Sequence, residues 1–145
     1  MRMTKAEREQ FLAEPRVGII GIDEGERAPR VVPLWYGFDP VLGVWVLTRE
    51  KSRKTDLLRK AGAFSLCVQE VTPFGYRHVS VQGPIIETRP CELERDFRPM
   101  VHRYLDYDTA EHFIAKSWSG ERVVFLMRPE HWITADLAEV LAAHG

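Results

Sequence analysis

Long apolar runs are missing from this sequence of 145 residues, and none approaches the roughly 20 residues that a membrane-spanning helix needs. The first 16 residues carry charges throughout and contain no apolar core of a signal peptide. We therefore expect a cytoplasmic protein that does not bind a membrane.

Cysteine is scarce, and neither charge sign dominates. Cys67 and Cys91 match neither a paired metal-binding spacing nor a disulfide framework, and Cys67 lies in an apolar run where a small buried side chain is expected. The five histidines lack the spacing of a zinc motif, so no metal site is expected. The formal net charge of -1 gives no overall attraction to nucleic acid, so any anion-binding site has to be local.

A glycine-rich phosphate-binding loop of either nucleotide-binding type is also absent. The sequence instead has a dense cationic segment, residues 49–54, between a predicted strand and a predicted helix. The free N–H groups and the dipole at the start of a helix favour an anion, and Ser52, Arg53 and Lys54 add side-chain donors. A solvated helix face without a ligand is the alternative interpretation of these charges.

Short segments with strand periodicity make up most of the chain. The pattern predicts strands over 17–22, 30–38, 44–48, 63–69, 76–88 and 122–127, and helices over 4–13, 51–61, 91–105 and 136–143. Closely spaced strands with inserted rather than alternating helices indicate an antiparallel barrel and not a doubly wound α/β sheet. We predict a single domain over 1–145 that is mainly β with peripheral helices, built as a six-stranded antiparallel barrel.

Three segments stand in a characteristic order: Val32-Pro33-Leu34-Trp35-Tyr36, then residues 44–48 with Ser52-Arg53-Lys54 and Leu57, and finally residues 77–83. Together they resemble the signature of the pyridoxamine 5'-phosphate oxidase-like superfamily, and the last segment resembles the R-x-V-x-V-x-G strand of that family. Residues 11–16 and 128–132 are most similar to its flavin- and deazaflavin-dependent oxidoreductases. The resemblance covers about 11–132 and implies an FMN-binding split barrel, forming a homodimer in which both chains contact each cofactor.

The resemblance also implies which residues bind the cofactor. The tricyclic ring would lie along the second strand, at Val32, Pro33, Leu34 and Trp35, and would be lined by Leu47 and Thr48 of the third strand. The phosphate would be held by the cationic turn, through Lys51, Ser52, Arg53 and Lys54. The cofactor would also be approached by Arg77 and His78 of a later strand. The arginine-rich C-terminal motif of the true oxidases is missing, so oxidation of pyridoxamine phosphate is not expected.

The implied cofactor is the deazaflavin F-420 or FMN. F-420 carries an oligoglutamate tail, and the additional cations Arg49, Arg59 and Lys60 favour it over FMN. The expected activity is hydride transfer to or from a small organic substrate, with the cofactor itself carrying the hydride. Three side chains are candidates to protonate the substrate: Tyr36, Tyr76 and His78. A non-catalytic flavin or F-420 carrier and a haem-binding protein on the same scaffold remain open alternatives.

Overall fold

The computed structural model describes residues 1–137, so most of the helix predicted over 136–143 lies outside the described residues. Eight strands form one antiparallel sheet in the order β2-β1-β5-β6-β7-β4-β3, and β8 pairs with β6. The strands are β1 (Gly18–Ile22), β2 (Arg30–Leu34), β3 (Tyr36–Asp39), β4 (Gly43–Arg49), β5 (Ala63–Thr72), β6 (Gly75–Pro90), β7 (Arg122–Met127) and β8 (His131–Asp136). No helix in the described part of the chain is long and apolar enough to cross a membrane.

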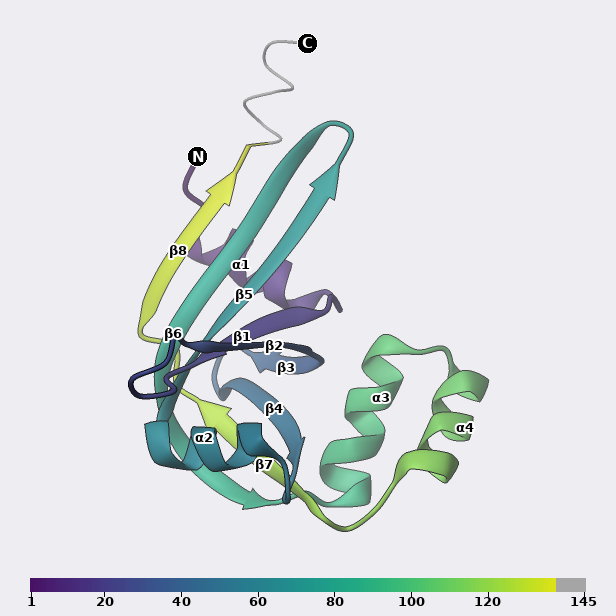
Figure 1. Cartoon of the computed structure of the whole chain (residues 1–145). Coiled ribbons are helices and arrows are strands. Elements are labelled where there is room, and N and C mark those ends of the chain that lie inside the picture. The colour runs from purple at the N-terminus through teal and green to yellow at the C-terminus, as the bar shows by residue number, and fades with distance from the viewer. Residues whose placement is uncertain (138–145) are drawn as a thin grey trace.

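The two end strands of the sheet are halves of one extended segment that breaks at Trp35. β2 pairs with β1, whereas β3, directly after the break, pairs with β4 at the other end of the sheet. The sheet therefore curves round so that its two end strands meet at Trp35 without pairing with each other, which confirms the predicted split barrel (Figure 1). The strand count exceeds the predicted six because the segment 30–38 divides at Trp35 and because β8 was not predicted.

The barrel core is built from every second residue of the strands. In β5, Phe64, Leu66 and Val68 point inward, whereas Ser65 and Cys67 point outward. The prediction that Cys67 is buried is therefore wrong, because the alternation of side chains along a strand places it on the outer face. The run appeared continuously apolar because the outer face of this sheet also carries few charges.

The helices follow their sequence signals with one omission. α1 (Lys5–Ala13) follows the predicted capping box of Thr4 and Glu7. α2 (Arg53–Ala61) is capped by Ser52 at its start and by Gly62 at its end. The helix predicted over 91–105 is a π-helical turn, η1 (Leu93–Phe97), followed by α3 (Arg98–Tyr104). α4 (Tyr107–Ser117) was not predicted, although its cap residue Asp106 accepts a hydrogen bond from the N–H of Thr109.

α3 and α4 form a second core with the outer face of β4 and β7. Trp45 and Leu47 of β4 point toward this core, whereas Val44, Val46 and Thr48 point into the barrel. In Figure 1 the two helices lie to the right of the barrel, and the β5–β6 hairpin extends beyond the barrel at the top. β4 is thus covered on both faces, while the part of the sheet formed by β2, β1, β5, β6 and β8, which we call the upper sheet, has one uncovered face.

Candidate functional site

The barrel is open where β2 separates from β4, beside the start of α2. β3 pairs with β4 as far as Tyr36 opposite Val46. Before that point the chain turns toward β1, and Leu34 lies opposite Gly18. Among the described strands, β2 therefore pairs only with β1, and residues 47–49 of β4 pair only with β7. The split leaves two strand edges available for a ligand.

Trp35 lies at this break and is fixed by aromatic neighbours. Its ring stacks on Tyr104 with centroids 5.0 Å apart and planes at 6°, and it meets Phe113 at 5.6 Å and 51°. The Tyr104 hydroxyl accepts a hydrogen bond from the Tyr36 N–H at 3.1 Å and lies 2.9 Å from the carbonyl oxygen of Arg16. Tyr104 therefore holds both the break in the strand and the indole ring of Trp35.

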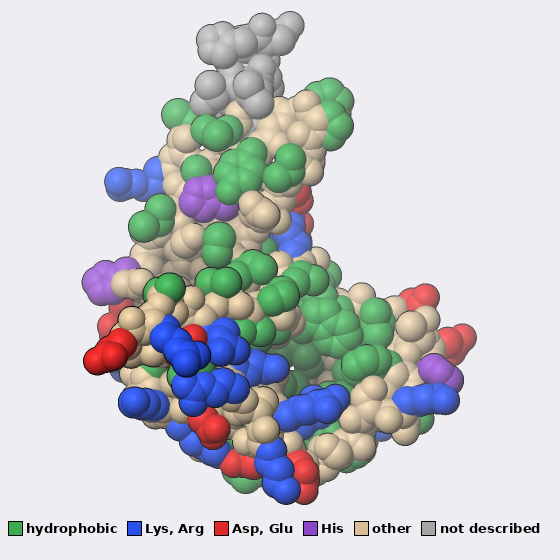
Figure 2. Space-filling view, viewed as in Figure 1, with side chains coloured by type: hydrophobic (Ala, Val, Ile, Leu, Met, Phe, Trp, Pro, Cys, Tyr) green, Lys and Arg blue, Asp and Glu red, His purple; other side chains and the backbone are tan. Residues whose placement is uncertain are grey.

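Two hollows meet at Trp35. A shallow depression of about 390 Å³ is lined by Val17, Pro33, Leu34, Trp35 and Phe113. A smaller hollow of about 120 Å³ shares three of these side chains and continues under the helices; it is lined by Leu34, Trp35, Leu47, Phe97, Met100, Val101, Phe113 and Arg122. We call this smaller one the Trp35 hollow. Figure 2 shows hydrophobic side chains between the barrel and the helices, and a cluster of Lys and Arg side chains to their left.

The cationic turn between β4 and α2 is held by hydroxyl groups. The carbonyl oxygen of Arg49 accepts hydrogen bonds from Ser52 N–H at 3.2 Å, from the Ser52 hydroxyl at 2.9 Å and from the Thr55 hydroxyl at 2.5 Å. The buried hydroxyls of Thr48 and Thr55 lie 2.6 Å apart. Ser52 caps the N–H of Thr55, so the N–H groups of the first two helical residues are left to face a ligand.

Several cations around this turn have no acidic partner. Arg49, Lys51 and Lys54 form no ion pair with any described residue. Other cations nearby are neutralised, because Arg59 holds Glu50 with distances of 2.5 and 3.0 Å, which keeps the pKa of that carboxyl below its usual range. An excess of positive charge therefore remains at the start of α2, where the helix dipole adds to it.

The structure brings ten of the twelve predicted residues to the two sides of the split. These are residues 32–35, Leu47 and Thr48, and residues 51–54. Within this set, Leu47 and Thr48 point to opposite faces of β4: Leu47 lines the Trp35 hollow, but Thr48 is only 1% exposed beneath α2. The hydroxyl groups of Thr48 and Ser52 are engaged in holding the turn.

The two remaining predicted residues, Arg77 and His78, lie away from the split. They are on β6 near the tip of the β5–β6 hairpin, at the opposite end of the molecule from α2 in Figure 1. Arg77 donates a hydrogen bond to Glu70 at 2.6 Å, and its guanidinium lies 5.0 Å from the Phe11 ring centroid. A single chain therefore does not bring these two residues to the split.

The three candidate proton donors differ in access. Tyr36 is fully buried, its hydroxyl donates to the carbonyl oxygen of Leu12 at 2.9 Å, and burial raises the pKa of its phenol to about 12. These properties make Tyr36 a core residue. Tyr76 and His78 lie together on the sheet, with ring centroids 5.6 Å apart.

Three residues of the site were not identified from the sequence. Tyr104 and Phe113 come from the helices that follow β6, and Phe113 lies on the helix that was not predicted. The i, i+4 spacing of Ala110 and Ile114 behind the cap at Asp106 was the available signal for that helix. Arg122 at the start of β7 has no distinguishing sequence context, because only the strand pairing places it opposite Arg49.

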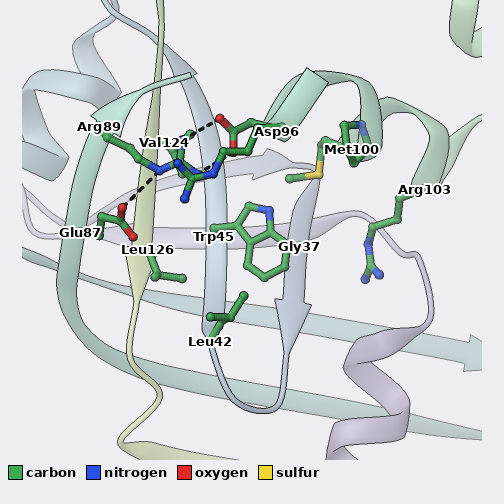
Figure 3. Close-up of a pocket in the computed structure, with 12 residues that line it drawn as sticks. Gly37, Leu42, Trp45, Glu87, Arg89, Asp96, Met100, Arg103, Val124 and Leu126 are labelled. Atoms are coloured by element: carbon green, nitrogen blue, oxygen red, sulfur yellow. Dashed lines mark hydrogen bonds and ion pairs between the residues drawn. The ribbon is translucent and has the colours of Figure 1, made fainter. Parts of the chain in front are cut away.

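Another hollow, of about 250 Å³, lies between α3 and the outer face of the β3–β4–β7 sheet (Figure 3). Trp45 lies at its centre, and the guanidinium of Arg89 makes two 2.6 Å hydrogen bonds to the carboxylate of Asp96 at one end. Arg103 donates to the carbonyl oxygens of Leu12 and Ala13. These two arginines already have partners, and none of the predicted site residues lines this hollow, so it is less suited to a phosphate than the split.

No protein-family model matches the chain, and no curated protein sequence matches it. Solved structures do. The conserved hypothetical protein Rv2991 of Mycobacterium tuberculosis is 21% identical with a TM-score of 0.72, and the match covers 94% of this chain and 86% of that one. An F420 reductase is 17% identical with a TM-score of 0.60, covering 86% and 94%. A FAD-binding protein of Mesorhizobium loti is 19% identical with a TM-score of 0.66, covering 92% and 95%.

The same fold occurs in a candidate pyridoxamine 5'-phosphate oxidase of Listeria innocua and in the heme storage protein HutZ of Vibrio cholerae. Because the sequence identities are low, these likenesses establish the architecture alone. The chain has the split-barrel fold of the pyridoxamine 5'-phosphate oxidase-like proteins, as its sequence predicts.

Proposed function

We propose that this protein is an oxidoreductase that binds a phosphorylated flavin or deazaflavin in the split of its barrel. One observation carries the proposal: the unpaired cations Lys51 and Lys54 lie at a helix start beside a split with an apolar depression at Trp35. The combination suits a cofactor that has a flat apolar ring and an anionic chain. The F420 reductase and the FAD-binding protein of the same fold support this choice.

In this proposal the ring lies in the shallow depression along β2, against Pro33, Leu34 and Trp35, and the phosphate accepts hydrogen bonds at the start of α2. The bound cofactor supplies the hydride chemistry. The chain binds the phosphate through Lys51, Lys54 and the free N–H groups of α2, with Arg53 beside them. Tyr104 and Phe113 fix Trp35 so that the apolar wall is in place before the cofactor arrives.

F-420 is the first choice of cofactor, and FMN is the second. Of the three cations that favour the longer anionic tail, Arg59 is already paired with Glu50. Arg49 and Lys60 form no ion pair with the described residues and remain available to carboxylates of the tail. The preference for F-420 therefore rests on these two side chains.

We also propose that the active form is a homodimer joined through the outer face of the upper sheet. The strand register aligns two rows across β2, β1, β5, β6 and β8, and neither row contains Lys, Arg, Asp or Glu. The rows are Pro33, Ile19, Cys67, Ser80 and Ile133, and Val31, Gly21, Ser65, Gln82 and His131. Val31 is 66% exposed and Ile133 is 70% exposed in the single chain. An uncharged sheet face of this kind favours a second copy as its cover.

The dimer gives His78 a role that the single chain does not. His78 lies on β6 in the uncovered region of the sheet, next to Tyr76, whereas Arg77 points to the opposite face, where it contacts Glu70 and Phe11. In the homodimer that we propose, His78 contacts the cofactor that is held at the split of the partner. Each site is then complete only when both copies are present.

An absorption titration tests the function. Purified protein is titrated with F-420, FMN and haemin, and the reduced cofactor is then mixed with a set of quinone and enone acceptors. The proposal predicts saturable binding of F-420 or FMN and oxidation of the reduced cofactor by an acceptor. Binding without turnover would identify a cofactor carrier, and a Soret band with haemin alone would identify a haem-binding protein.

Sedimentation velocity tests the dimer. Cys67→Arg introduces a charge at the centre of the proposed interface and is expected to give a monomer with weakened cofactor binding. Val41→Arg is the matched control, because Val41 is 92% exposed in the β3–β4 turn, away from that face. A wild-type monomer at concentrations where the cofactor is bound would contradict the dimer.

A further inference from the structure

Arg122 is a partly buried cation for which residues 1–137 provide no counter-ion. Its Nη2 donates to the carbonyl oxygen of Ser117 at 3.1 Å, and its guanidinium lies 4.7 Å from the centroid of the Phe97 ring. Its Nε is buried without a hydrogen-bond partner. It forms no ion pair with a described residue. A desolvated cation without a counter-ion is costly, so an anion at this position would be stabilising.

The charged residue that faces Arg122 across the sheet has the same sign. Arg49 lies directly opposite it in the β4–β7 pair. Burial lowers the pKa of Arg122, and Arg49 lowers it further, while no carboxylate acts in the opposite direction. Like charges at facing positions of two strands destabilise a sheet. A bound anion between them would reverse this repulsion.

Arg122 lines the Trp35 hollow, and the other residues that line it are apolar. Leu47 and Phe113 provide apolar surfaces without a polar group, and Trp35 adds the flat surface of its indole ring. An anion that fits here must therefore have an apolar body and a single charged end.

The size of the Trp35 hollow limits the ligand further. Its volume of about 120 Å³ is below that of the cavity of about 150 Å³ that takes up benzene in another protein, so a ligand can place only one end in the hollow, and the rest of the ligand must extend into the shallow depression. A tricyclic flavin does not fit inside it. The hollow shares Leu34, Trp35 and Phe113 with the shallow depression, so a molecule held here would touch a ring lying in the depression.

We propose that the Trp35 hollow is a substrate pocket for small aromatic or conjugated carboxylic acids, whose carboxylate is bound by Arg122. Binding of such acids is a property of the cofactor-free chain, whereas the role as a substrate pocket rests on the proposed oxidoreductase function. The planar guanidinium can donate two parallel hydrogen bonds to a carboxylate. The conjugated part of the acid then lies at the mouth of the depression, where the cofactor ring is proposed to bind.

The test uses the cofactor-free protein and two probes of nearly equal shape, cinnamate and the neutral cinnamamide. Binding is followed by quenching of tryptophan fluorescence and by calorimetry. We expect cinnamate to bind at least about tenfold more tightly than cinnamamide, as a charge-assisted pair in a partly dry pocket should. Arg122→Gln should abolish this preference, and Arg122→Lys should retain part of it.

Two controls separate this inference from the alternatives. Arg128→Gln removes an exposed arginine that pairs with Glu130 on another part of the surface, and it should leave the preference unchanged. Circular dichroism shows whether Arg122→Gln is folded, and Arg122→Lys provides the second variant if it is not. F-420 and FMN affinities are measured on the same samples and should change by no more than about threefold.

Equal binding of the two probes by the wild type, or a preference that survives in Arg122→Gln, would overturn the inference. So would a loss of cofactor affinity in Arg122→Gln as large as that caused by removing the lysines of the turn, because Arg122 would then hold the cofactor phosphate. A protein that binds cinnamate through Arg122 but binds no flavin would refute the proposed function and leave this pocket standing. Flavin binding without any preference for cinnamate would refute the pocket at Arg122 and leave the proposed function standing.

Discussion

Removing the two unpaired lysines beside the start of α2 should weaken cofactor binding strongly. We choose Lys51→Ala with Lys54→Ala because neither ammonium group has an acidic partner in the part of the chain that the structure describes, whereas Arg53 is 60% exposed and lies 3.8 Å from Glu24. At about 4 Å from a phosphate, one unit charge contributes about 1 kcal/mol in water and about 4 kcal/mol at an effective dielectric constant of about 20.

The exposure of the two side chains places the effect near the lower limit. Lys51 is exposed and Lys54 is partly buried, so we expect about 1–2 kcal/mol for each. The double variant should therefore bind F-420 or FMN about 30- to 1,000-fold more weakly than the wild type. The dissociation constant is measured by equilibrium titration, followed through cofactor fluorescence, at two salt concentrations.

The control variant removes the same number of charges far from the split. Arg2→Ala with Lys5→Ala changes exposed side chains at the N-terminal end and should leave the affinity unchanged. Wild-type affinity should also fall as salt rises, and this slope should be smaller in the lysine double variant. A double variant that binds within about twofold of the wild type would refute the phosphate site at this turn.

Three further predictions concern the scaffold. Thr55→Val removes the hydroxyl that contacts Thr48 and the turn, and should cost about 1–3 kcal/mol of unfolding free energy in urea titrations. Gly83→Ala should destabilise by more than about 3 kcal/mol, because a Cβ there would lie 1.8 Å from the carbonyl oxygen of Arg128; normal thermal stability would contradict this. Burial raises the pKa of Asp96, but hydrogen bonds from Arg89 and the backbone outweigh it and leave the pKa below its usual value. The stability from this pair is therefore present above about pH 4 and lost as the pH falls through the folded-state pKa, and Asp96→Asn should flatten acid unfolding in this range.

The strands that carry the barrel were predictable because their hydrophobic periodicity reports the packing of one face. The capping box at Thr4 and the stop at Gly62 fixed two helices in the same way, since both signals are local hydrogen-bond or backbone requirements. The division of the second strand at Trp35 was not predictable, because it depends on which strand each half pairs with. β8 was missed because none of its residues is fully buried in the chain, so its apolar pattern is weak.

The candidate site shows the same division between local and distant information. The cationic turn was recognisable, since its charges and its helix start are adjacent in the sequence. The burial of Thr48 follows from the inward phase of β4, which the alternation with Leu47 already implied. Arg122 and Phe113 reach the site only through the pairing of β7 with β4 and the packing of α4, so no local pattern indicates them.

The most direct test of the central proposal compares FMN with riboflavin, which has the same ring and lacks only the phosphate. Both dissociation constants are measured on the wild-type protein under identical conditions of pH and salt. A phosphate held by the turn between β4 and α2 predicts that FMN binds at least about 100-fold more tightly. Equal affinities for the two compounds would contradict the account, because the start of α2 would then contribute nothing to recognition.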